Sequence, residues 1–245
     1  ETGQAPACMH SCVGRIRYLG VLLYDADKIK EYASCPNNQI IDRQMDIYLD
    51  PFSEKVIKEA KKNGIADSTI EAAQKSPVYK FVKDWKIALP LHAEFRTMPS
   101  LFYVPSMLPV IGKMTNGLYE STTENLWGKI EDSRLPVQYL ANLFSAGNPD
   151  KIKEVLKKLM TVRYHRRKVT VNDIDDTLIN DAFKTTGLTA DIADAIYRLT
   201  SLIKYDERFV IPPAHREEAI EMIESTDDRK GNTGLGGNNG TRRVF

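Results

Sequence analysis

Residues 148–160 read Asn148-Pro149-Asp150-Lys151-Ile152-Lys153-Glu154-Val155-Leu156-Lys157-Lys158-Leu159-Met160. Asparagine followed by proline is typical of a helix start, because the asparagine side chain caps free backbone N–H groups and proline fits the first helical position. The apolar residues that follow recur every three or four positions, which places them on one face of a helix. This stretch therefore predicts a helix that begins after Asn148 and buries one side.

Further helices are predicted on both sides of this stretch. Thr189 fits the cap of a helix whose apolar residues recur at helical spacing up to Ile203, and a last helix is expected over 213–223. Before it, a helix is expected over 136–146, ended by Gly147. A shorter helix is predicted at 27–33, and another begins at Asp50-Pro51 and ends at Gly64. Two more are predicted to begin at the capping box of Ser68 with Glu71 and at Pro77. The expected fold class is mainly α with short strands.

Other segments depart from the helical pattern. Residues 15–24 are rich in residues that favour β-structure and predict a short strand or two, and a loop is expected over 34–50. The aromatic-rich segment 88–112 contains four prolines, which exclude a long helix or a central strand, so we expect an extended arm lying across another surface. A variable loop is expected at 112–133.

The composition indicates a globular chain. It has 245 residues, of which 42% are hydrophobic, yet no run of about 18 apolar residues that could span a membrane. The net charge of +1, from 34 basic and 33 acidic residues, gives no reason to expect a nucleic-acid partner. The sequence begins at Glu1, without an initiator methionine or a signal peptide, and we interpret it as a fragment or a processed product.

Two of the three cysteines stand close together, in Cys8-Met9-His10-Ser11-Cys12. By spacing alone, Cys8 and Cys12 fit two buried thiols or a disulfide as well as part of a metal site. In two-cluster ferredoxins, a run of three cysteines is followed after three residues by a fourth that ligates the other cluster. On that interpretation the two thiolates serve two different clusters, whose other ligands are absent from this chain. The chain alone should then carry no cluster.

Several ordered blocks resemble one known family. The block from Gly3 to Asp27 is similar to the last cluster motif of the iron–sulfur β subunit of respiratory nitrate reductases and nitrite oxidoreductases. Later blocks that resemble the same subunit are Ser76–Lys80, Ala88–His92 with Phe95–Thr97 and Tyr103–Pro105, Leu135–Leu143, and Asp206–Val210 before Pro212 and His215–Glu217. The resemblance covers about residues 1–225 and identifies the chain as the C-terminal half of such a subunit.

This resemblance implies an electron-transfer subunit without substrate chemistry of its own. Family members carry three [4Fe-4S] clusters and one [3Fe-4S] cluster, and relay electrons between a molybdenum-containing catalytic α subunit and a membrane haem b subunit or another electron carrier. The position matching Cys8 ligates the second cubane counted from the catalytic end, and the position matching Cys12 ligates the first. The resemblance also divides the chain into the end of a bis-[4Fe-4S] ferredoxin-like domain at 1–26, a helical subunit-contact domain at 27–224 and a flexible Gly-rich tail at 225–245.

Two other functions stay open. The chain could be a structural interaction domain without clusters, or belong to a related molybdenum oxidoreductase for selenate, chlorate, dimethyl sulfide or ethylbenzene. The resemblance implies association with the cytoplasmic face of the cell membrane through partners, with an extracytoplasmic side as the alternative. The direction of electron flow is not set by this subunit.

Several further polar residues are candidates for a functional role. Cys35 is interpreted as an ordinary thiol and His92 as a structural residue that holds the proline-rich segment by a hydrogen bond. His10 fits either a hydrogen bond to cluster sulfur or an exposed spacer. Positive charge at Arg15 and Arg17 either raises a cluster potential or forms a salt bridge to Asp25 or a partner. A solvated helix end or subunit contact is expected for the basic run Arg163, His165, Arg166, Arg167 and Lys168.

Overall fold

The computed structural model describes residues 6–105, 113–115, 118–120, 126–127, 130, 135–172 and 174–212. Within these ranges the chain is mainly helical, with two two-stranded antiparallel sheets. The helix expected over 213–223, the tail at 225–245 and most of the loop expected at 112–133 lie outside the described residues. None of the described helices is long and apolar enough to cross a membrane.

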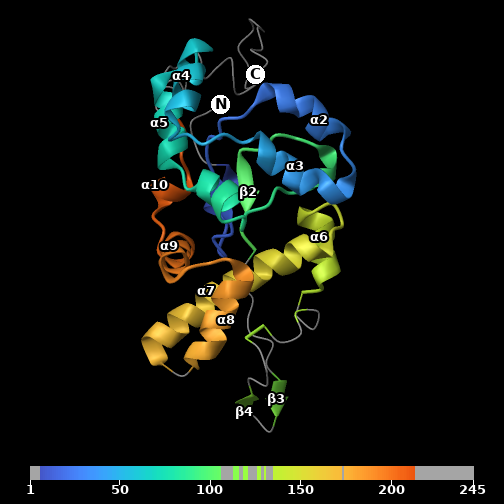
Figure 1. Cartoon of the computed structure of the whole chain (residues 1–245), viewed down its shortest axis with the longest axis vertical. Helices are drawn as coiled ribbons and strands as arrows, with labels where there is room; N and C mark the ends of the chain where they lie inside the picture. The colour runs from blue at the N-terminus through green and yellow to red at the C-terminus, as the bar shows by residue number, and fades with distance from the viewer. Residues whose placement is uncertain are drawn as a thin grey trace, which may run out of the picture.

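The longest described helix, α7 (Pro149–Val171), begins where the sequence predicts. Asp150 N donates a hydrogen bond of 3.1 Å to the Asn148 side chain, and Pro149 occupies the first helical turn. The predicted apolar stripe is buried, with exposed fractions of 4% or less at Ile152, Val155, Leu156, Leu159 and Met160. In Figure 1, α7 runs diagonally across the lower half of the molecule, where it packs against α6 (Val137–Phe144), α8 (Asp176–Thr186) and α9 (Ala190–Ser201).

The helices α6 and α9 confirm two further predictions. α6 is followed by Gly147, whose φ of +84° lies in the left-handed region that glycine adopts readily. α9 is capped by Thr189, whose hydroxyl accepts a hydrogen bond of 3.3 Å from Ile192 N. No sequence signal predicted α8 between them. It is capped by Asp175, which accepts a hydrogen bond of 2.7 Å from Thr177 N.

Residues 26–47 contain one helix more than predicted. The expected helix is present as the 3-10 turn Ala26–Lys28 and α2 (Ile29–Ser34). The loop predicted for 34–50 is wrong, because α3 (Ile40–Ile47) occupies it after a second 3-10 turn. The polar Gln44 interrupts the apolar stripe of α3, but it is buried and its amide donates hydrogen bonds to the Tyr32 hydroxyl and to Thr97 O.

The next three helical segments are present with shifted starts. α4 (Glu54–Lys62) begins after Pro51, because the Asp50 side chain accepts a hydrogen bond from Phe52 N and forms a turn first. α5 (Asp67–Lys75) has Ala66 at its N-cap and no side-chain cap, so the predicted capping box of Ser68 and Glu71 is wrong. The segment after Pro77 contains the π-helical turn Lys80–Asp84, closed by a hydrogen bond of 2.8 Å from Trp85 N to Lys80 O.

A short sheet joins the first residues of the chain to the middle. β1 (Arg17–Leu19) confirms the strand predicted at 15–24, and it pairs antiparallel with β2 (Leu101–Tyr103). Tyr18 and Phe102 face each other in this pair and are both 0% exposed in the main core, which also contains buried residues of α3, α6, α7 and α9. In Figure 1, β2 lies centrally, with α2 and α3 on one side and α4 and α5 on the other. A ferredoxin-like remnant at 1–26 stays a prediction.

The described part of the proline-rich segment has no α-helix, as predicted. Leu89 and Tyr103 exchange two backbone hydrogen bonds of 2.9 and 2.8 Å, so residues 89–103 fold back on themselves. The turn contains the 3-10 helix Ala93–Phe95 between His92 and Arg96, which have φ values of +52° and +53°. An arm reaching across a partner surface stays a prediction. The described strands β3 (Lys113–Thr115) and β4 (Leu118–Glu120) form a separate antiparallel pair at the bottom of Figure 1.

Candidate cluster-ligand site

The two predicted ligands lie at one short helix. α1 (Ala7–His10) carries Cys8, and Cys12 follows directly after the C-cap residue Ser11, whose N–H donates a hydrogen bond of 2.9 Å to Ala7 O. Both thiols are free and only partly buried. The structure therefore shows neither a disulfide nor a pair of buried thiols at this position. Partly exposed free thiols are available as ligands.

Met9 anchors this helix from between the two cysteines. It is 0% exposed and packs on Phe209, which is 3% exposed, in a small apolar cluster separate from the main core. Val210 N donates a hydrogen bond of 3.0 Å to Leu19 O, so the segment after α10 (Tyr205–Arg208) runs beside β1. The cysteine-bearing helix is thus attached to a segment about 200 residues later in the sequence.

Two arginines bind consecutive carbonyl groups of α1. Arg17 Nη1 donates to Cys8 O at 2.6 Å, and its guanidinium lies over the Tyr103 ring, 5.5 Å from the centroid. Arg208 Nη2 donates to Met9 O at 3.3 Å. Carbonyl groups at the end of a helix often lack intrahelical partners, and basic side chains commonly supply the missing donors. Met9 O also accepts a hydrogen bond of 3.3 Å from Cys12 N.

The pKa values of Arg17 and Tyr18, two neighbouring residues of β1, are both raised. Burial acts to lower the pKa of Arg17, but the hydrogen bond and the electrostatic interaction with Tyr103, followed by the interactions with Cys12 and Cys8, outweigh it and raise the pKa. Burial raises the pKa of Tyr18, and the nearby Arg208 opposes that shift. The Tyr18 hydroxyl stays protonated and donates a hydrogen bond of 3.3 Å to Leu199 O, which links β1 to α9.

His10 and α10 form the outer part of the site. His10 is exposed, and its ring stacks on that of Tyr205 at a centroid distance of 5.6 Å. The Tyr205 hydroxyl lies 3.4 Å from His10 Nε2. Glu207 holds α10 to α9 by an ion pair with Arg198, and that hydrogen-bonded pair, followed by the Lys204 N–H, lowers the pKa of Glu207.

The described residues cannot complete a cluster site. No group of three or more His, Cys, Asp or Glu that could hold a metal ion occurs among them. A cubane cluster requires four thiolates, so Cys8 and Cys12 fit only as part of a ligand set that other residues complete. Cys35 is a free thiol, 8% exposed, in the main core, which agrees with its interpretation as an ordinary thiol.

The other predicted residues lie elsewhere or have local partners. Asp25 pairs with Lys28 at 3.9 Å, and within the described ranges no ion pair joins it to Arg15 or Arg17. His92 has the expected structural role, because its Nδ1 lies 2.8 Å from Glu94 Oε1 and its backbone N–H donates to Leu143 O.

The basic run forms the last turns of α7. Arg163, Arg166 and Arg167 are exposed there, as predicted for a solvated helix end. Arg166 lies over the Tyr197 ring, and Lys168 pairs with Asp176 at 3.2 Å. His165 is the exception in this run, since it is buried against Phe183.

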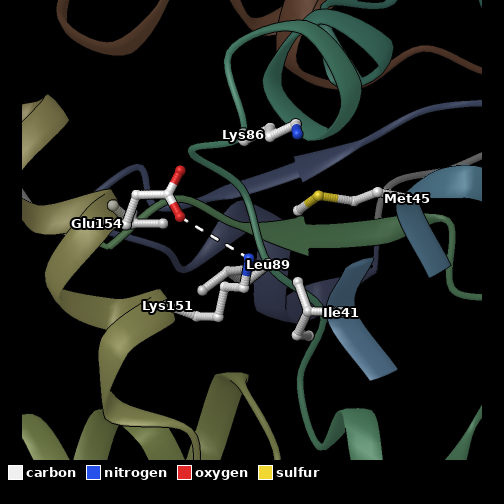
Figure 2. Close-up of a pocket in the computed structure, with 7 residues that line it drawn as sticks. Ile41, Met45, Lys86, Leu89, Lys151 and Glu154 are labelled. Atoms are coloured by element: carbon white, nitrogen blue, oxygen red, sulfur yellow. Dashed lines mark ion pairs between the residues drawn. The ribbon is translucent and has the colours of Figure 1, made fainter. Parts of the chain in front are cut away.

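A small hollow between α3 and α7 is shown in Figure 2. Ile41, Met45, Leu89 and Val155 form its apolar lining, and the hollow has room for about one water molecule. Lys151 Nζ lies 3.9 Å from Glu154 Oε2 and 2.6 Å from Asp42 Oδ1, so the basic group of Lys151 is paired with two carboxylates. The hollow offers no convergent set of polar groups for a substrate.

Comparison with known proteins gives a consistent result. Residues 107–190 match the family model described as respiratory nitrate reductase beta C-terminal. The nitrate reductase beta chain of Bacillus subtilis (strain 168) is 45% identical over 224 residues, which are 91% of this chain and 45% of that protein. The respiratory nitrate reductase 1 beta chain of Escherichia coli (strain K12) is 46% identical over 224 residues, again 91% of this chain and 43% of that protein.

A more distant relative widens the family. The chlorate reductase subunit beta of Ideonella dechloratans is 31% identical over 180 residues, which are 73% of this chain and 36% of that protein. The sequence similarity, together with the helical fold and the helix next to the cysteine pair, places the chain in the class of reductase β chains. The chain belongs to the family of respiratory nitrate reductase β chains. It spans less than half the length of the two nitrate reductase β chains named above.

Proposed function

We propose that the chain is part of an electron-transfer subunit of a nitrate reductase or nitrite oxidoreductase, in which Cys8 and Cys12 each supply one thiolate to a different [4Fe-4S] cluster. Such clusters, when bound, accept and release single electrons. The observation that carries the proposal is the pair of free, partly exposed thiols of Cys8 in α1 and Cys12 just after it, in a chain about 45% identical to nitrate reductase β chains.

The residues of this chain would contribute ligands and rigidity. Met9 fixes α1 in an apolar cluster, and Arg17 and Arg208 hold two of its carbonyl groups, so Cys8 lies in an anchored helix and Cys12 directly follows it. A ligand held in place before the cluster is bound loses less conformational freedom when it binds. The proposed subunit has three parts here: 1–26 as the end of the cluster-binding domain, 27–224 as the helical subunit-contact domain and 225–245 as a tail.

The proposal extends to the whole complex. The full subunit would carry three [4Fe-4S] clusters and one [3Fe-4S] cluster, with most ligands outside this chain. It would pass electrons between a molybdenum-containing α subunit and a membrane haem b subunit or another carrier, at the cytoplasmic face of the membrane. The alternative of a chlorate-type β subunit is less favoured, because the chlorate reductase relative is 31% identical and the nitrate reductase relatives are 45–46% identical.

The test is to purify the full-length subunit with its catalytic partner under anaerobic conditions. Iron and sulfide are then measured chemically, and the clusters are examined by visible absorbance and electron paramagnetic resonance. We expect iron–sulfur signals in the complex and none in the 245-residue chain alone. A complete complex without iron would contradict the proposal and favour a structural interaction domain. Activity of the partner on nitrate, chlorate and selenate would identify the substrate.

A further inference from the structure

Two guanidinium groups converge on the helix that carries the proposed ligands. Arg17 from β1 binds Cys8 O at 2.6 Å, and Arg208 from α10 binds Met9 O at 3.3 Å. The two arginines come from opposite ends of the described chain, yet they contact adjacent residues of one helical turn. Their positive charges are therefore concentrated at the cysteine-bearing helix.

Neither guanidinium group forms an ion pair with a carboxylate of the described residues. Among the described residues, no carboxylate oxygen lies within 4.0 Å of a guanidinium nitrogen of Arg17 or Arg208. Arg208 is 8% exposed, and the Nε atoms of both arginines are buried without a hydrogen-bond partner. Burying an unpaired charge is strongly unfavourable, whereas a neutral donor would suffice to cap a carbonyl group. This arrangement favours a negative charge supplied to the site from outside the described residues.

A cubane held by four thiolates is such an anion. It is negatively charged in both redox states and gains one further negative charge when it accepts an electron. A fixed positive charge nearby stabilises the reduced state more than the oxidised state and so raises the reduction potential. The donor set at α1 and the uncompensated charge beside it therefore fit the same group.

We propose that Arg208, acting together with Arg17, is a positioning and charge-compensating residue for the clusters that Cys8 and Cys12 ligate. This inference rests on the proposed function. Arg208 fixes the backbone of α1 through Met9 O, and its charge balances the charge of the bound cluster. Its place is set by α10, which Glu207 and Phe209 attach to α9 and to the Met9 cluster. The helical part of the chain thereby controls the potential of a cluster for which α10 supplies no ligand.

The experiment compares three variants of the full-length subunit in its complex. Arg208→Gln removes the charge, Arg208→Lys keeps it, and Arg43→Gln is a control at a partly exposed arginine of α3 that pairs with Glu31. Each complex is titrated potentiometrically, and every cluster is followed by its paramagnetic resonance signal. Iron content is measured in parallel.

For Arg208→Gln we expect the equilibrium constant for reduction of at least one cubane to fall about tenfold. This lowers its reduction potential by about 59 mV for a one-electron couple. The other clusters should stay unchanged, and Arg208→Lys and Arg43→Gln should behave like the unaltered complex. Potentials unchanged in Arg208→Gln, or shifted equally in Arg208→Lys, would overturn the inference while leaving the proposed function intact.

The lysine variant decides the outcome if the glutamine variant fails to assemble. In that case Arg208→Lys must still assemble with unaltered potentials, and its failure to do so would show that charge is not the relevant property. Iron absent from the unaltered complex would overturn the proposed function, and the inference with it.

Discussion

The guanidinium of Arg208 donates a hydrogen bond of 3.3 Å to the backbone carbonyl oxygen of Met9, although 199 positions separate the two residues. Met9 stands between Cys8 and Cys12, and the neighbour of Arg208, Phe209, covers the Met9 side chain. The last described helix, α10, is therefore fastened to α1, which contains Cys8 and lies just before Cys12. The packing around this connection leads to three predictions, and a fourth tests the two proposed ligands.

Phe209 should be essential for the attachment of the cysteine-bearing helix. Phe209→Ala removes the aromatic ring packed on Met9 and should lower the free energy of unfolding by about 3–5 kcal/mol. Amide hydrogen exchange at residues 7–12 should also become faster. The matched control is Leu202→Ala, because Leu202 is 64% exposed and its loss should change the free energy of unfolding by less than about 0.5 kcal/mol. Equal effects of the two substitutions would contradict the packing described here.

Gly20 should tolerate no side chain. A Cβ at this position would lie 1.9 Å from Ser76 Oγ and 2.8 Å from Ser76 Cβ, so Gly20→Ala forces the end of β1 away from Ser76. We expect a loss of about 1–3 kcal/mol in urea unfolding, as for other overpacked sites. Gly14→Ala is the control, because the nearest atom to its Cβ would be 3.5 Å away. A stable Gly20→Ala protein would show that β1 and Ser76 are further apart.

The attachment of α10 should weaken in acid. The ion pair with Arg198, and then the hydrogen bond from Lys204 N, lower the pKa of Glu207 from its ordinary value of 4.5. Because the folded-state pKa is the lower one, the carboxylate contributes its stabilisation fully above pH 4.5 and loses it as the pH falls through the folded-state pKa. Hydrogen exchange in α10, corrected for the intrinsic rate, should therefore accelerate in acid. Glu207→Gln should remove this pH dependence, and an unchanged profile in that variant would refute the assignment.

Local sequence rules predicted the helices whose signals are local. Asn148 and Thr189 cap α7 and α9 as expected, because each cap involves residues only two or three positions away. α3 was missed because Gln44 looks like a break in an apolar stripe. Its burial depends on partners at Tyr32 and Thr97, which a local pattern does not reveal. The capping box predicted at Ser68 and Glu71 is wrong, because α5 begins at Asp67 and Ser68 therefore lies inside the helix instead of at its N-cap.

The candidate site was predictable only in part. The spacing of Cys8 and Cys12 and the resemblance of the flanking block identified the ligands proposed here. Arg17 was a candidate because it follows them in sequence, but Arg208 was not, since its role depends on a contact across 199 positions. The block Asp206–Val210 resembled the family, and that was the one sequence signal that could have directed attention to it.

The central claim is that Cys8 and Cys12 ligate two different clusters, and paired cysteine variants test it most directly. Cys8→Ala and Cys12→Ala, with Cys35→Ala as the control at a buried free thiol, are introduced into the full-length subunit and assembled anaerobically with its partner. Paramagnetic resonance during a redox titration then resolves the individual clusters. The account predicts that each of the first two variants loses or alters the signal of a different [4Fe-4S] cluster, and that Cys35→Ala retains all signals. A full set of unaltered signals in Cys8→Ala and Cys12→Ala, or loss of the same single cluster in both, would contradict it.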